Sequence, residues 1–255
     1  MDLPLTKPEQ LAQAEALYCR HKALCAERGI GRLQEKSVHG ILKFLLAPDP
    51  CHHEVKLPEG PVADIYDGET ITEIQTGAYP ALAKKLERLL PYYKVRVVCP
   101  IVRDRYLHYI NKEDGSIEKG RKSPLHGARV TSLVALSALD CFLEDPNFSL
   151  FFLLVDVSEY RTRKAVGYRA KSEKCDCVPL CIADAWTVQS REDYKGLLPE
   201  ALPEPFTAEQ FGKVTHLRAR KRYFALKLLQ NHSVVRQIGR QGRAYLYTKE
   251  PQGGL

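Results

Sequence analysis

The sequence predicts an α/β fold in which helices flank a mixed β-sheet, with a small basic module at the C-terminal end. In the first part of the chain, apolar residues alternate between helical and strand spacing in the order helix, three strands, helix, strand. No run of about 18 apolar residues occurs, so no membrane-spanning helix and no membrane partner are expected. Residues 1–200 carry 28 basic and 28 acidic side chains, so the net charge of +7 lies in residues 201–255.

The expected elements follow from spacing and from the residues that break it. Leu82, Leu86 and Leu89 predict a helix that begins at Pro80 and ends at Pro91. The other elements expected before residue 196 are helices over 8–28, 33–46 and 128–143, strands over 53–57, 62–66, 69–75, 95–101, 149–157 and 161–169, and a polar hairpin over 106–110 and 116–119.

Acidic residues gather on the predicted hairpin of residues 62–75. A two-residue turn at Asp67-Gly68 would pair Asp64 with Ile71 and place Asp64, Glu73 and Gln75 on one face. Two neighbouring carboxylates suit a hard divalent cation such as Mg²⁺ or Mn²⁺. The same charges could also serve only to keep an edge strand soluble.

A third acid, Glu35, precedes Val38 and Leu42 at helical spacing and is therefore expected on the buried face of its helix. A carboxylate aimed at a core is costly unless it is paired or bound to a metal. A solvated charge near the start of the helix is the alternative interpretation.

Glu35, Ala63-Asp64 and Glu73-Ile74-Gln75 resemble the motif of the PD-(D/E)XK nuclease superfamily, over about residues 30–102. The resemblance implies a restriction-endonuclease-like core, with Asp64 and Glu73 as catalytic metal ligands. It also implies that Glu35 is an accessory acid and that Gln75 takes the place of the usual lysine. Gln75 offers only a neutral hydrogen bond where lysine would offer a charge, and Ala63 replaces the proline of the motif.

Residues 196–206 contain three prolines and are expected to link a nuclease-like domain (1–195) to a second domain (207–255). Thr207 and Gln210 form a capping-box pattern that predicts a helix. A helix over 217–230 and strands over 234–238 and 244–248 should follow, an order that resembles the C-terminal part of a winged-helix domain. The expected DNA-binding residues are Arg218, Arg220, Lys221, Arg222, Lys227, Arg240 and Arg243.

The sequence thus favours a metal-dependent DNA endonuclease-like protein that hydrolyses phosphodiesters. Two alternatives stay open: a catalytically inactive DNA-binding or regulatory protein on the same scaffold, and a protein–protein adaptor in a mobile-element or defence system. No secretory signal is recognised, so a cytoplasmic location and eight reduced cysteines are expected. A homodimer is compatible with the resemblance.

Overall fold

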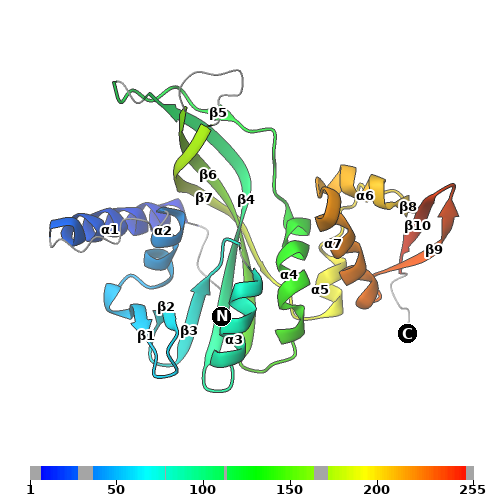
Figure 1. Ribbon diagram of the computed structural model, residues 1–255, viewed down its shortest axis with the longest axis horizontal. Coiled ribbons are helices and arrows are strands. Elements are labelled where there is room, and N and C mark those ends of the chain that lie inside the picture. The colour runs from blue at the N-terminus through cyan, green and yellow to red at the C-terminus, as the bar shows by residue number, and fades with distance from the viewer. Residues whose placement is uncertain (1–6, 28–36, 78, 112–113, 164–171, 251–255) are drawn as a thin grey trace.

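The computed structural model describes residues 7–27, 37–77, 79–111, 114–163 and 172–250 (Figure 1). Its α-helices are α1 (Pro8–Glu27), α2 (Ser37–Leu46), α3 (Tyr79–Leu89), α4 (Leu133–Leu139), α5 (Arg191–Lys195), α6 (Ala208–Thr215) and α7 (Ala219–Asn231). Its strands are β1 (His53–Lys56), β2 (Val62–Tyr66), β3 (Thr70–Ile74), β4 (Lys94–Ile110), β5 (Arg121–Lys122), β6 (Phe148–Arg163), β7 (Ser172–Thr187), β8 (Phe206–Thr207), β9 (Val235–Gln241) and β10 (Ala244–Lys249).

The larger sheet is mixed and has the order β1-β2-β3-β4-β6-β7, with β5 paired to β4. The first three strands are antiparallel neighbours, whereas β3, β4 and β6 run parallel to one another. Each parallel step passes through a helical connection, α3 between β3 and β4 and α4 between β4 and β6. The predicted α/β class with helices flanking a mixed sheet is confirmed.

Apolar side chains cover the sheet on both faces. Leu82, Leu86 and Leu89 of α3 form the predicted stripe and pack with α4 against one face. Val38 and Leu42 of α2 pack against the other face. Figure 1 shows α1 and α2 on one side of the sheet and α3 and α4 on the other. The strands that carry Asp64 and Glu73 therefore lie between helices.

The central strands are longer than the sequence predicts. Strand β4 joins the expected strands 95–101 and 106–110 into one element, with a register irregularity against β6 between Val102 and Arg105. The charged residues at this point lie between the two expected strands, and in the structure they have partners across the sheet. Arg103 pairs with Asp156, and Arg105 lies 3.3 Å from Glu159.

Strand β7 was not predicted, because its cysteines and charged residues interrupt the alternation of apolar and polar side chains that indicates a strand. Its antiparallel partner β6 continues from the expected strand 149–157 through Arg163. The rest of the expected strand 161–169 lies outside the described residues. All eight cysteines are free thiols.

The C-terminal module consists of α6, α7 and a three-stranded sheet of order β8-β10-β9. Thr207 caps α6 by accepting from the Gln210 N–H, and the Gln210 side chain accepts from the Thr207 N–H, so the predicted capping box is confirmed. Leu197, Leu202 and Phe206 of the proline-containing segment are buried. They belong to one apolar cluster that extends from α3 and α4 to α6 and α7.

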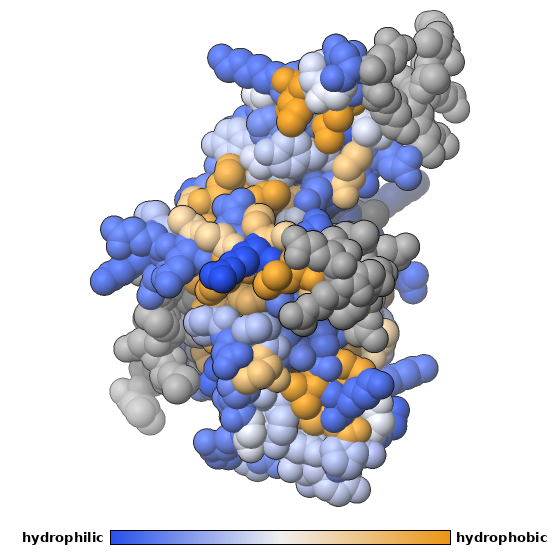
Figure 2. Space-filling view, turned by 90° about the vertical axis from the view of Figure 1, so that its left-hand side faces the viewer, coloured by the Kyte–Doolittle hydropathy of each residue, from blue (hydrophilic) through white to orange (hydrophobic). Residues whose placement is uncertain are grey.

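Seen from the side of α1 and α2, the apolar surface is divided into separate areas by hydrophilic side chains (Figure 2). Across the described part of the chain, no helix has both the length and the apolar character needed to cross a membrane.

Candidate functional site

The site lies where the ladder between β2 and β3 ends. This ladder pairs Ile65 with Thr72 and Tyr66 with Ile71. Continuing the register by one residue sets Asp64 opposite Glu73. The expectation that both carboxylates lie together holds, although the expected pairing of Asp64 with Ile71 is wrong.

Asp67 explains the different register. Its Oδ1 atom accepts hydrogen bonds from the backbone N–H groups of Glu69 at 2.9 Å and Thr70 at 2.7 Å. These local bonds compete with a two-residue turn and widen the loop. The pairing shifts by two residues relative to the predicted one. Because this number is even, the shift itself does not move side chains to the other face of the sheet.

Beyond the end of the ladder, side-chain carboxylates accept the hydrogen bonds that backbone carbonyl groups accept within it. The Asp64 N–H donates to Glu73 Oε1 at 3.3 Å, and the Ile74 N–H donates to Asp64 Oδ2 at 2.8 Å. Each acid thus accepts from the backbone of the opposite strand. Since these N–H groups would otherwise lack strand partners, the exchange fixes both carboxylates in the gap between β2 and β3.

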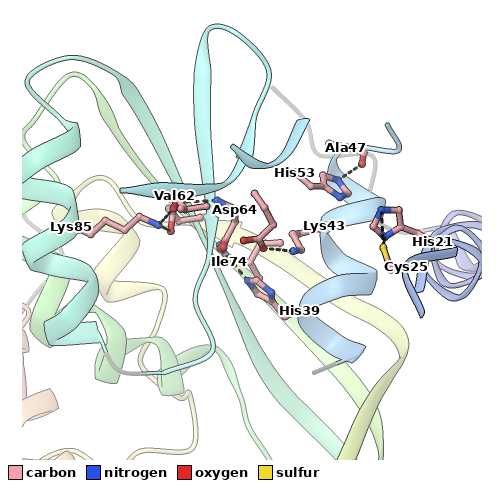
Figure 3. Close-up of polar contacts among 12 residues, drawn as sticks. His21, Cys25, His39, Lys43, Ala47, His53, Val62, Asp64, Ile74 and Lys85 are labelled. Carbon is pink, nitrogen blue, oxygen red and sulfur yellow. Dashed lines mark hydrogen bonds and ion pairs between the residues drawn. The ribbon is translucent and has the colours of Figure 1, made fainter. Parts of the chain in front are cut away.

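Lys85 of α3 and His39 of α2 approach Asp64 and its surroundings from opposite sides (Figure 3). Lys85 of α3 donates to Glu73 Oε2 at 2.5 Å and to the Val62 carbonyl at 2.6 Å. The His39 Nε2 atom of α2 lies 3.1 Å from Asp64 Oδ2. Asp64 Oδ1 accepts no hydrogen bond within the described residues, which leaves an oxygen for a ligand.

The surroundings of Asp64 and Glu73 shift their pKa values in opposite directions. Burial, reinforced by the negative charge of Asp64, raises the pKa of Glu73 to about 7, against the opposing effect of Lys85. Burial also disfavours ionised Asp64, but His39 and the Ile74 N–H outweigh it and lower the pKa of Asp64. Asp64 is therefore the anion at neutral pH, and Glu73 is poised to gain or lose a proton.

Lys85 is the site residue that sequence reasoning missed. It lies three residues after Leu82 and four before Leu89, on the buried stripe of α3. A lysine on such a stripe indicates a buried acidic partner, because an unpaired ammonium there would be costly. His39 gives a similar signal, since it lies three residues before the buried Leu42.

The remaining predicted residues are not joined to the pair by hydrogen bonds. Gln75 follows β3, and its backbone N–H donates to the Val98 carbonyl at 2.8 Å. Its half-buried side chain makes no hydrogen bond within the described residues. Glu35 lies outside the described residues.

The seven predicted DNA-binding residues all lie in the C-terminal module. Arg218 is the N-cap of α7, four more residues lie on α7, Arg240 lies on β9 and Arg243 lies in the following turn. Figure 1 places this module beyond α4, at the opposite end of the molecule from β1 and β2. The carboxylate pair and the basic residues therefore lie in separate parts of the molecule.

Comparison with known proteins places most of this structure in one family. The model of a domain of unknown function (DUF8091) matches residues 36–189, which include the larger sheet and the carboxylate pair. An uncharacterized protein of Treponema pallidum (strain Nichols) is 32% identical over 235 residues, covering 88% of this chain and 89% of that protein. No solved structure matches. The chain belongs to the DUF8091 family.

Proposed function

We propose that the protein is a metal-dependent nuclease that hydrolyses phosphodiester bonds in DNA, built on a restriction-endonuclease-like core. The observation that carries the proposal is the opposition of Asp64 and Glu73 across the gap between β2 and β3. The strand order supports it, since an antiparallel β1-β2-β3 unit is followed by α3 and a β4 parallel to β3. This is the element order that the resemblance implies.

The residues present fit Mg²⁺ or Mn²⁺. Both acids offer oxygen atoms, the donors that these ions prefer, and their mutual repulsion is what a divalent cation would relieve. Asp64 and Glu73 would hold the ion. Once bound, the ion would lower the pKa of water and neutralise charge on a phosphoryl group.

The protein's own side chains have distinct roles in this proposal. His39 orients Asp64 through the hydrogen bond to Oδ2. In the motif, a lysine at the position of Gln75 usually provides a positive charge. Here Lys85 provides that charge, and it is hydrogen-bonded to Glu73. A charge held there stabilises the negative charge that develops on a phosphate during hydrolysis. Gln75 can donate a hydrogen bond to a water molecule or a phosphate oxygen.

The C-terminal module would hold the DNA. The order β8, α6, α7, β9 and β10, with β10 between β8 and β9, supports a winged-helix-like arrangement. Arg218, Arg220, Lys221, Arg222 and Lys227 would follow α7 along the phosphates, with Arg240 and Arg243 on the wing. Phosphate contacts of this kind supply affinity with little sequence information.

One observation favours the alternative of a DNA-binding protein that does not cut. The ammonium of Lys85 lies 2.5 Å from Glu73 and already compensates part of the negative charge of the pair. A nuclease-like protein that has lost its activity could keep its two acids without a metal ion, because Lys85 compensates part of their charge.

A cleavage assay separates the two functions. Supercoiled plasmid, single-stranded and branched DNA are incubated with Mg²⁺ or Mn²⁺ and with wild type, Asp64→Asn, Glu73→Gln or Glu69→Gln. Glu69 is the matched control, because it is an exposed carboxylate on the same hairpin. Cutting that Asp64→Asn and Glu73→Gln abolish and Glu69→Gln keeps supports the nuclease. DNA binding without cutting, unchanged in all variants, supports the alternative.

A further inference from the structure

Three aromatic side chains of the C-terminal module face solvent. Tyr223 and Phe224 of α7 are 55% and 47% exposed, and Tyr245 of β10 is 42% exposed. Scattered apolar residues on a surface are ordinary, but a group of large ones marks an interaction site. Their grouping on one small module therefore requires an explanation.

An arginine guanidinium lies over each of these rings. Arg222 lies 5.0 Å from the ring centroid of Tyr223, Arg220 lies 5.4 Å from Phe224, and Arg240 lies 4.5 Å from Tyr245. Arg240 also donates to the Tyr245 hydroxyl at 2.7 Å. Such contacts hold a flat ring and a positive charge side by side.

Helix α7 and the β9–β10 wing pack against each other. Leu226 and Leu229 of α7 belong to the same apolar cluster as Tyr247 of β10. Tyr245 lies two residues before Tyr247 on β10, so the two side chains leave the same face of that strand. Tyr245 therefore lies on the face of the wing that is turned toward α7.

A basic hollow of about 400 Å³ opens beside this surface, where α6 turns into α7. Its lining residues are Glu209, Gly212, Lys213, His216, Leu217, Arg218 and Arg222. Glu209 is paired with Lys213 at 2.9 Å, so Arg218 and Arg222 leave the lining net positive. The Arg222 Nε atom is buried and has no hydrogen-bond partner within the described residues.

Arg222 connects the hollow with the aromatic surface, because it lines the first and lies over Tyr223 of the second. A nucleotide carries a charged phosphate next to a flat base. Its phosphate would fit the basic hollow, and its base would fit against the ring of Tyr223. We infer that this surface binds single-stranded nucleic acid, with a backbone phosphate in the hollow and unpaired bases stacked on Tyr223 and Tyr245.

Unpaired bases are favoured over a duplex. In a duplex the faces of the bases are already stacked on neighbouring bases, whereas in a single strand these faces are free to stack on aromatic side chains. Charge favours nucleic acid over a protein partner, because residues 213–243 contain nine Lys and Arg and no Asp or Glu. The inference rests on the proposed function and deepens it: the strand held by the C-terminal module would be unpaired.

Fluorescence anisotropy on the full chain tests the inference, with a chelator present to prevent cleavage. The probes are a labelled oligothymidylate of about 16 nucleotides and a duplex of equal length, each titrated at rising salt. We expect the single strand to bind more tightly and Tyr223→Ala or Tyr245→Ala to weaken it about tenfold. Tyr223→Phe should retain affinity, because it keeps the ring. The control is Tyr92→Ala, since Tyr92 is 69% exposed in the loop after α3.

Equal or tighter binding of the duplex, or unchanged single-strand affinity in both alanine variants, overturns the inference. Tight duplex binding with metal-dependent cutting would leave the proposed nuclease intact. Absence of salt-sensitive binding to either probe would remove the DNA-holding role of the module as well, and would favour a protein partner.

Discussion

The Lys85 ammonium of α3 lies 2.5 Å from the Glu73 carboxylate of β3 and also donates to the Val62 carbonyl on β2. One side chain thus joins α3 to the two strands that carry the acidic pair. Because Glu73 is 3% exposed, its negative charge depends on this partner.

Lys85→Ala is therefore expected to destabilise the metal-free protein above pH about 7, where Glu73 is charged in the wild type. The loss should be about 2 kcal/mol, less than the ~3–5 kcal/mol of a fully buried pair, because the Lys85 side chain keeps 24% exposure. Urea unfolding measures it. Lys84→Ala, the exposed neighbour on the same helix, should change stability little. Equal losses in the two variants would mean that the ion pair contributes nothing specific.

Stability should also depend on pH through Glu73. Its pKa is about 7 in the fold and 4.5 in the unfolded chain, so the folded chain binds more protons between these values. The stabilising contribution is complete below pH about 4.5 and is lost as pH rises through about 7. Glu73→Gln stays neutral and should flatten this slope in urea unfolding with a chelator present. Glu69→Gln should keep it; a slope unchanged in Glu73→Gln would contradict the raised pKa.

The C-terminal module should unfold together with the sheet. Asp140 accepts from the Tyr194 hydroxyl and lies 2.7 Å from His232 Nε2, while the rings of Tyr194 and His232 stack at 4.2 Å. Trp186, the single tryptophan, reports on β7 by fluorescence, whereas circular dichroism reports on the whole chain. We expect coincident urea transitions, and a loss of about 1 kcal/mol in Tyr194→Phe. Two separate transitions would instead indicate independent domains.

Gly212 makes room for Arg222. A Cβ atom at this position would lie 2.6 Å from Arg222 Cδ and 2.9 Å from the Leu217 carbonyl oxygen. Gly212→Ala should therefore displace Arg222 and weaken nucleic-acid binding several-fold in anisotropy titrations. Gly239→Ala is the control on the wing, because nothing lies within 4 Å of its added carbon. Equal affinities for the two variants would show that the position of Arg222 is unimportant.

Sequence reasoning predicted the carboxylate pair because the alternation of side chains in a hairpin is unchanged by a register shift of two residues. It did not predict the register, which depends on the hydrogen bonds of Asp67 to the loop. Sequence reasoning also predicted two strands where the structure has the single strand β4. The charged residues between them have partners, such as Asp156, on strands that are distant in sequence. Lys85 was missed for the same reason: its partner is identified only when α3 packs on the sheet.

The most direct test of the central claim is a calorimetric titration of the metal-free protein with Mn²⁺ near pH 7. We predict one site per chain that Asp64→Asn and Glu73→Gln abolish and that Glu69→Gln retains. Affinity in wild type should rise as pH rises through about 7, because Glu73 must lose its proton to bind the ion. Mn²⁺ binding that survives in both Asp64→Asn and Glu73→Gln, or its absence in wild type, would contradict the assignment of this pair as a metal site.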